Sequence, residues 1–238
     1  MDLIAEEIYD ILIEKEVKAL YHANSVRTSK TFLQQGGLLS RKYVEDNKLV
    51  QTIQKSDDKD KIFNIWDDIF LDAINISRYF TQYNVYGPIL FAFRLDLLKN
   101  KEVKTVRITK RNPLYWREGE GNVERYFQTV EDFKSKFKSG NKLNDGGYHI
   151  TFTTLNGFLS FKHLEAIQID NPGVYVTNSK GEKKLISDCI IQYFSEDLSK
   201  NYISMDQVYV RDDLTLKFQY RILNQFRKQV FRRLFLPE

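Results

Sequence analysis

The stretch LYHANSVRTSKTFLQQGGLLSR at residues 20–41 decides how the chain is interpreted. Residues 19–23 form a short and mostly apolar run, which favours a β-strand. Ser25 or Thr28 can cap a helix that runs to the Gly36-Gly37 pair, and glycine is the usual residue at a helix end. The sequence therefore predicts a strand, then a helix, and then a sharp turn at the glycine pair that ends the helix.

Two further segments follow in order along the chain. IFLDAINISRYF at residues 69–80 predicts a strand and then a helix from Asp72, and YGPILFAFRLDLL at residues 86–98 contains an almost wholly apolar run. Such a run is typical of a strand that is buried on both faces. We expect further strands at residues 103–108, 148–153, 157–161 and 166–169, and helices at residues 129–137 and 181–194 and from about Asp213 onward.

The whole chain reads as one α+β domain. Its 238 residues carry 42% hydrophobic and 14% aromatic side chains, which is enough for a sizeable core and excludes a disordered composition. Strands and helices are interspersed, and no linker or internal repeat interrupts residues 1–238. We expect a core over about residues 18–170 and a C-terminal helical addition over about residues 181–238.

Charge and cysteine content exclude several classes of protein. The net charge is +4, which permits an anionic partner without requiring one. The single cysteine, Cys189, excludes an internal disulfide and a cysteine-based zinc site, so no metal is expected. The acidic N-terminus is unlike a secretory signal, and no apolar run is long enough to span a membrane. These features predict a cytoplasmic protein with no membrane partner.

Taken together, the three segments resemble the ADP-ribosyltransferase fold of the His-Tyr-Glu type. The strand with YHA, the helix and GGLLS look like the first motif of that family. IFLD with ISRYF is similar to the second motif, and YGPILFAFRLDL is similar to the central strand that follows it. The resemblance implies a split β-sheet core. Taken singly, His22 could equally be a structural histidine, and Gly36-Gly37 a plain helix stop.

The resemblance also implies a binding site for NAD as co-substrate. His22 would anchor the ribose, the backbone of Ala23 would hold the nicotinamide amide, and Phe70 stands where the family usually has a tyrosine. Arg41 could reach a pyrophosphate oxygen or could be a solvated surface arginine. The expected set of NAD-binding residues is His22, Ala23, Asn24, Gly37, Leu39, Arg41, Phe70, Ser77 and Tyr79. His22, Phe70 and Tyr79 are also expected to be catalytic.

The catalytic acid of the family has no obvious counterpart. The family places a glutamate at the start of a strand after a loop, where it stabilises positive charge on the ribose. Here GNKLNDGG at residues 140–147 and YHITFTT at residues 148–154 follow in that order, but the strand contains no carboxylate. The candidates are Asp145 in the loop, His149 on the strand, and Glu118 and Glu120 if the chain folds back.

Basic and aromatic residues are interleaved in two places, which suits single-stranded nucleic acid. One group is Lys217, Arg221, Arg227, Lys228, Arg232 and Arg233 with nearby phenylalanines, and the other runs from Lys101 to Arg117. A helix with a solvated basic face, or one that docks a protein partner, explains the first group equally well. We expect an ADP-ribosyltransferase acting on RNA or DNA, similar to DarT-like toxins that have an antitoxin or act in phage defence. The alternatives are an NAD-dependent RNA 2′-phosphotransferase and a non-catalytic binding module of the same fold.

Overall fold

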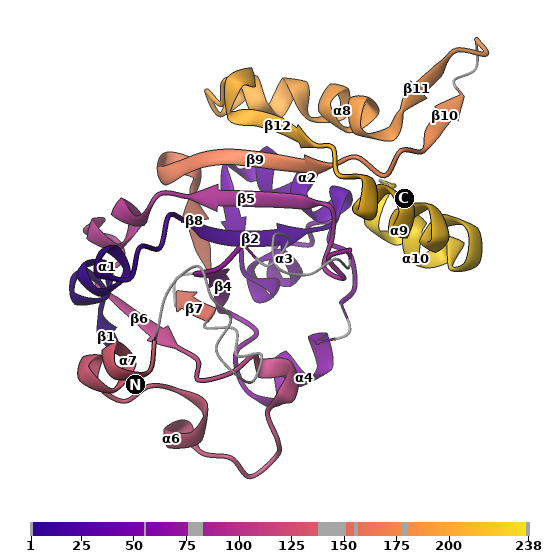
Figure 1. Ribbon diagram of the computed structural model, residues 1–238. Coiled ribbons are helices and arrows are strands. Elements are labelled where there is room, and N and C mark those ends of the chain that lie inside the picture. Colours follow the sequence, from indigo (N-terminus) through magenta and orange to yellow (C-terminus); the bar gives the residue numbers. More distant parts are fainter. Residues whose placement is uncertain are drawn as a thin grey trace.

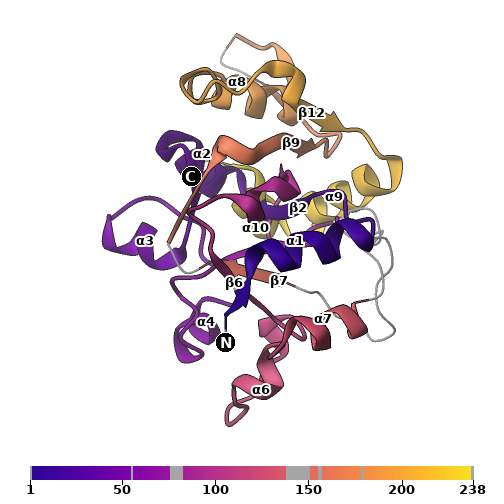
Figure 2. The same cartoon turned by 90° about the vertical axis from the view of Figure 1, so that its left-hand side faces the viewer.

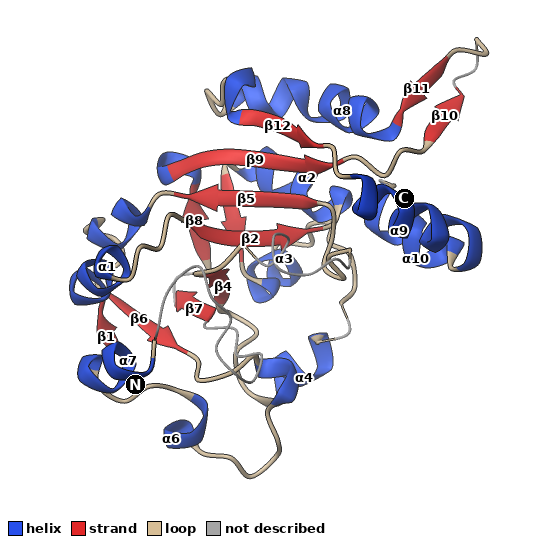
Figure 3. Ribbon diagram, viewed as in Figure 1, coloured by secondary structure: helices blue, strands red, loops and turns tan. Residues whose placement is uncertain are grey.

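The computed structural model describes residues 2–54, 56–75, 83–137, 151–154, 157–177 and 180–236, with 151–154 described as backbone. Helices and strands alternate along the chain and build the expected α+β fold (Figures 1 and 3). The turned view places α8 (Ile186–Lys200) and α6 (Asn122–Arg125) at opposite ends of the molecule (Figure 2). No helix in these ranges is long and apolar enough to cross a membrane.

Within the described residues, eight strands form the main sheet. Its order is β1 (Leu3–Ile4), β6 (Thr105–Ile108), β7 (Thr151–Thr154), β4 (Ile69–Asp72), β2 (Leu20–Asn24), β5 (Ile89–Phe93), β9 (Leu164–Asp170) and β12 (Val208–Arg211). Neighbouring strands are antiparallel except β12, which runs parallel to β9. All five residues of β5 are buried, which explains its continuous apolar sequence.

The sheet is nearly divided between β2 and β4. These strands pair at one position only, Tyr21 opposite Asp72, whereas β2 pairs with β5 along its full length. Two half-sheets therefore meet at a single residue pair. This arrangement agrees with the split sheet expected from the sequence.

Residues 20–41 fold as their pattern predicts. The Ser25 hydroxyl oxygen accepts a hydrogen bond from the Thr28 amide and so caps α2 (Val26–Gln35). Gly36 ends that helix with φ of +78°, in the left-handed region that glycine adopts without a steric penalty. The chain leaves the turn as β3 (Gly37–Leu39), which pairs with β8 (Phe158–Ser160), and then enters α3 (Arg41–Asp46).

Helices cover the sheet and complete the core. The remaining ones are α1 (Ala5–Glu14), α4 (Asp57–Ile62), α7 (Val130–Lys136), α9 (Leu214–Phe226) and α10 (Lys228–Phe235), with 3-10 turns at Leu95–Lys99, Pro113–Tyr115, Phe161–His163 and Met205–Gln207. Tyr220 of α9 is fully buried, and its hydroxyl donates to Asp170 at the end of β9 at 2.7 Å. Arg211 of β12 contacts the same carboxylate at 2.8 Å. These contacts fix α9 to the edge of the sheet.

Several expected elements differ from the structure. The predicted helix at residues 181–194 begins at Ile186, because Lys183–Leu185 form β11 and pair with β10 (Tyr175–Thr177) in a hairpin. The charged run at residues 54–61 has the composition of a solvated loop or helix end, yet it contains most of α4. The helix expected from Asp72 is not found at residues 73–75, which bend instead, and its later part lies outside the described residues. The C-terminal helix begins as predicted and breaks at Arg227 into α9 and α10.

Candidate functional site

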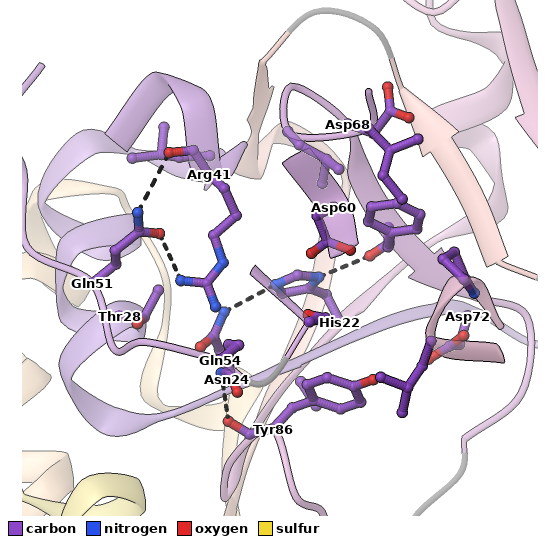
Figure 4. A pocket seen from close by; sticks show the side chains of 18 of the residues that line it. His22, Asn24, Thr28, Arg41, Gln51, Gln54, Asp60, Asp68, Asp72 and Tyr86 are labelled. Atoms are coloured by element: carbon purple, nitrogen blue, oxygen red, sulfur yellow. Dashed lines mark hydrogen bonds between the residues drawn. The ribbon is translucent and has the colours of Figure 1, made fainter. Parts of the chain in front are cut away.

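A cavity opens where the two half-sheets separate. Both sides of the split contribute to it, with His22 from β2 and Phe70 from β4. Arg41 of α3 and Asp60 of α4 line it from the neighbouring helices, and Tyr86 closes another side (Figure 4). The split in the sheet thus becomes a pocket surrounded by elements from distant parts of the sequence.

His22 is held in one tautomer by two hydrogen bonds. Its Nδ1 donates to the Phe70 carbonyl at 2.8 Å, so Nε2 has no proton in the neutral ring and accepts from the Asn24 side-chain amide at 3.3 Å. The Asn24 carbonyl oxygen accepts from the Ser25 amide at 2.9 Å, which fixes the orientation of that side chain. Burial, reinforced by the charge of Arg41, lowers the pKa of His22 to about 4. The imidazole is therefore neutral at pH 7 and presents an acceptor nitrogen.

Arg41 provides a positive charge beside this imidazole. Its Nη1 donates to the Gln51 side chain and to the Thr52 carbonyl, both at 2.8 Å, and its Nη2 lies 3.4 Å from Asp57. Burial lowers the Arg41 pKa, while the nearby Asp57 and Asp60 carboxylates raise it. Because an arginine starts from so high a pKa, the guanidinium remains charged.

The segment that holds Arg41 is itself anchored to the start of α2. The Thr52 amide donates to the Thr28 hydroxyl at 2.8 Å, and the Thr52 and Ser25 hydroxyls lie 2.6 Å apart. These buried contacts place Gln51 and Gln54, which both line the cavity. The helix cap at Ser25 is therefore bonded to the segment that forms part of the wall of the pocket.

Three carboxylates line the cavity. Both oxygens of Asp68 accept from the Arg107 guanidinium, and Asp72 lies at the end of β4 opposite Tyr21. Asp60 is partly buried on α4, and burial raises its pKa to about 6 against the opposing effects of the Ser56 hydroxyl and Arg41. At pH 7 Asp60 is mostly ionised.

Aromatic rings form the remaining wall. Phe70 packs against a small buried cluster made of Phe63, Ile65, Trp116 and Tyr126. Tyr86 lies on the other side of the cavity, where burial raises the pKa of its hydroxyl. Flat apolar faces beside amide and charged groups are typical of sites for planar, polar ligands.

Most of the expected NAD-binding residues that the structure describes are brought together. His22, Ala23, Asn24, Leu39, Arg41 and Phe70 all line the cavity. Gly37 is not among its lining residues. It pairs with Ser160, and a Cβ at this position would lie 2.4 Å from the Leu159 carbonyl oxygen, so its visible role is the close approach of β3 and β8.

The candidate acids fall elsewhere. Glu118 is exposed, and Glu120 pairs with Arg111; neither lines the cavity. Asp145 and His149 lie outside the described residues, as do Ser77 and Tyr79 of the expected NAD-binding set. In the parts of the chain that are described, no group of three or more histidine, cysteine or acidic side chains is placed to hold a metal.

Sequence reasoning did not find Asp60, Asp68, Gln54 or Tyr86. Asp60 lies in the run QKSDDKDK, which has the composition of a solvated surface segment. No local signal distinguishes it from its neighbours Asp57 and Asp58. Only the packing of α4 against the 3-10 turn at Pro113–Tyr115 directs one of these acids into a pocket, and the bond from Lys59 to the Leu114 carbonyl at 2.6 Å is part of that packing.

No protein-family model and no curated protein matches the chain. Among solved structures it is similar to DarT of Thermus sp. 2.9 in complex with ADP-ribosylated ssDNA, with 11% identity, a TM-score of 0.48, and 86% of this chain and 97% of that chain covered. The same DarT in complex with carba-NAD+ gives 10% identity, a TM-score of 0.45, and coverage of 86% and 98%.

A third similar structure is Thermosipho africanus DarTG in complex with ADP-ribose, with 12% identity and a TM-score of 0.43. The match covers 84% of this chain and about half, 51%, of that one. Similarity to DarT-like proteins is also what we expected from the sequence.

Proposed function

We propose that the protein binds NAD in the cavity at the split of the sheet, cleaves the nicotinamide–ribose bond, and transfers ADP-ribose to nucleic acid. One observation carries the proposal. The neutral His22, with Nδ1 committed to the Phe70 carbonyl, presents Nε2 in a cavity that also contains a buried arginine, aromatic rings and carboxylates. His22 and Phe70 are among the residues that the resemblance over residues 20–98 implies for binding NAD.

The chemistry of the cavity fits each part of the dinucleotide. Flat rings such as Phe70 suit the nicotinamide. The Nε2 acceptor of His22 suits a ribose hydroxyl that takes the place of the Asn24 amide, which can then donate to the ligand as well. The Arg41 guanidinium suits a pyrophosphate, because its donors match phosphate oxygens in geometry and charge.

The reaction imposes one further requirement. Bound NAD supplies a bond that breaks with its electron pair leaving on nicotinamide, which leaves positive charge on the ribose. Fixed negative charge near the ribose lowers the barrier, because groups already oriented in the folded protein need no reorganisation. Asp60 places such charge in the cavity, which Asp68 and Asp72 also line. The uncharged His22 does not add to the positive charge there.

Exposed rings and cations support nucleic acid as the acceptor. Phe218 and Phe226 of α9 are 64% and 72% exposed, and Arg221 and Arg227 beside them are also exposed. Arg233 of α10 donates to the Ile53 and Val85 carbonyls, next to Gln54 and Tyr86 of the cavity wall. The basic helices thus adjoin the cavity.

The second basic group, at residues 101–117, contributes less to a surface that binds nucleic acid. Arg107 and Arg111 pair with carboxylates, and Trp116 is only 2% exposed. Tyr115 is 63% exposed and follows Pro113 and Leu114, which line the cavity. We expect Tyr115 to be the ring of this group that is placed to stack on a nucleotide near the reaction site.

The biological role that suits this activity is a toxin of a toxin–antitoxin pair or of a phage-defence system. The support is the resemblance to DarT-like proteins together with α9, where the aliphatic Leu214 and Ile222 are exposed beside the rings. Exposed aliphatic side chains favour contact with a protein, such as an antitoxin, because they cannot stack on bases.

The direct test is incubation of the purified protein with NAD labelled in the adenosine half, together with single-stranded DNA, RNA or protein. We expect release of nicotinamide and label on nucleic acid. Label on protein alone would contradict the proposal that nucleic acid is the acceptor. Reaction only with RNA that carries a 2′-phosphate would favour the phosphotransferase, and NAD binding without turnover would favour the non-catalytic module.

A further inference from the structure

Building on the proposed NAD site, we propose that Asp60 is the catalytic carboxylate that faces the cationic nicotinamide–ribose end of NAD and makes the pocket select oxidised NAD over NADH. This assigns to α4 a role that sequence reasoning gave to a carboxylate elsewhere in the chain. It also identifies which charge state of the dinucleotide the pocket accepts.

Asp60 shares one cavity with the groups expected to bind NAD. Its carboxylate and the His22 imidazole both line the pocket (Figure 4). His22 is the expected ribose contact, and Phe70, whose carbonyl accepts the hydrogen bond from His22 Nδ1, is the expected nicotinamide contact. A ligand held by these two residues has its glycosidic bond in the part of the cavity that Asp60 borders.

Asp60 differs from the other two carboxylates of the cavity. Asp68 gives both its oxygens to Arg107, so its charge is neutralised within the protein. Asp72 has an interaction partner of its own at the end of β4. Among the described residues, Asp60 forms no ion pair, and its side-chain hydrogen bond comes from the Ser56 hydroxyl. Its negative charge remains available to a ligand.

The charges around Asp60 leave it ionised at neutral pH. Arg41 of α3 favours the carboxylate, whereas Asp57 on the same helix and Asp68 before β4 oppose it. Tyr86 and His22, on the other walls, are both uncharged at this pH. Burial is the largest influence and raises the pKa to about 6. A partly buried carboxylate attracts a cation more strongly than an exposed one, because water screens it less.

The position of Asp60 matters because positive charge moves from the nicotinamide to the ribose during the reaction. The bond between ribose C1′ and the nicotinamide nitrogen breaks, its electron pair neutralises the ring, and positive charge moves to the ribose. A nitrogen or oxygen of the nucleic-acid acceptor then bonds to C1′ and releases its proton to water. Asp60 stays ionised throughout and faces the positive charge before and after it moves. NADH has a neutral nicotinamide, so it gains nothing from this contact.

The binding test compares the uncleavable analogue carba-NAD+ with NADH by calorimetry. At pH 7.5 we expect the parent protein to prefer the cationic ligand by about tenfold or more, the effect of one weakly screened charge pair. Asp60→Asn should reduce this ratio to about one. Asp58→Asn is the matched control, because Asp58 is an exposed acid of the same helix, and it should keep the parent ratio. At pH 5 the preference of the parent should also fall, as Asp60 becomes protonated.

Asp60→Asn should fold normally, because burial of this site disfavours a charged side chain and asparagine has nearly the same shape as aspartate. It should release nicotinamide roughly 100-fold more slowly than the parent, the usual effect of removing one electrostatic stabiliser, and Asp60→Glu should restore part of the rate. An unchanged ligand ratio in Asp60→Asn overturns the assignment of Asp60 alone. A parent protein that binds neither ligand overturns the proposed function itself.

Discussion

The side chain of His22 joins the two half-sheets where their backbones do not pair. Its Nδ1 lies 2.8 Å from the carbonyl oxygen of Phe70, whereas β2 and β4 share only the pair Tyr21 and Asp72. One hydrogen bond therefore connects the strands and also sets the tautomer that presents Nε2. The geometry of the split and the chemistry of the pocket depend on the same residue.

His22→Ala should weaken NAD binding by roughly 10- to 100-fold, since losing a buried hydrogen-bonding group costs about 1–3 kcal/mol. Isothermal titration calorimetry measures the change, and circular dichroism checks that the variant is folded. His22→Gln is the control for position, because its amide can still donate to the Phe70 carbonyl. Equal NAD affinity in the parent and in His22→Ala would remove His22 from the site.

Arg41→Ala should weaken the binding of NAD but not of nicotinamide riboside, which has no phosphate. A charge-assisted hydrogen bond contributes about 1.5–3 kcal/mol, so NAD affinity should fall at least about tenfold. The comparison separates loss of a phosphate contact from general disruption of the segment that Gln51 and Thr52 fix. If both ligands lose affinity equally, Arg41 has a structural role and does not contact the pyrophosphate.

Gly37→Ala should destabilise the fold rather than act on NAD directly. The new Cβ would lie 2.4 Å from the Leu159 carbonyl oxygen, so β3 and β8 must separate. Overpacking of this kind costs about 1–3 kcal/mol. Urea denaturation should show the loss, while NAD affinity of the folded variant should stay within about twofold, a difference of ~0.4 kcal/mol. A stable Gly37→Ala with impaired NAD binding would instead support a direct contact.

The buried neutral histidine predicts a pH dependence of stability. The folded pKa of His22 is about 4 and the unfolded value is 6.5, so between these limits the unfolded chain binds a proton that the folded chain does not. The free energy of unfolding should therefore fall as pH drops from 6.5 to 4, by up to about 3 kcal/mol.

The effect of Asp60 on stability has the opposite sign. Its folded pKa is raised from 3.8 to about 6, so its contribution to the free energy of unfolding is lost as pH rises through that interval. Urea denaturation of the parent and of His22→Gln between pH 4 and pH 7.5 isolates the contribution of His22 to the free energy of unfolding. The advantage of the parent over the variant should shrink below pH 6.5. Parallel curves across the interval would show that His22 titrates alike in both states.

Phe218→Ser with Phe226→Ser should weaken the binding of single-stranded nucleic acid and leave nicotinamide release to water unchanged. Each stacked base contributes about 1–3 kcal/mol, so affinity should fall at least about tenfold. Tyr202→Ser is a control, because Tyr202 is 95% exposed and lies outside α9 and α10. Fluorescence anisotropy with a labelled oligonucleotide measures the change. Unaltered oligonucleotide affinity in the double variant would mean that α9 serves another partner.

The sequence was most informative where structure is determined locally. The Ser25 cap, the Gly36 stop and the apolar run of β5 each depend on a few adjacent residues, and all three are found. The C-terminal segment alternates as a strand would, yet Leu216, Tyr220 and Leu223 are the buried residues of a helix. The lack of any helix breaker there was the better guide.

The sequence was least informative where distant segments determine the outcome. Lys183–Leu185 become a strand because Tyr175–Thr177 lie opposite, which no local pattern reveals. Asp60 faces a cavity because α4 packs beside the turn at Pro113–Tyr115. The residues named in advance, mainly from residues 20–41, are a minority of those that line the cavity, and most of the others come from segments that approach only after folding.

The composition of one half-sheet has a consequence for the synthesis of the protein. Its strands β2, β5, β9 and β12 come from residues between 20 and 211. Of these, β5 pairs with β2 along one edge and with β9 along the other. On the ribosome, the apolar Ile89–Phe93 must wait for more than half of the chain to emerge before β9 can pair with it. Such late pairing favours slow folding and transient exposure of apolar surface. Expression at low temperature or with chaperones should therefore raise the soluble yield.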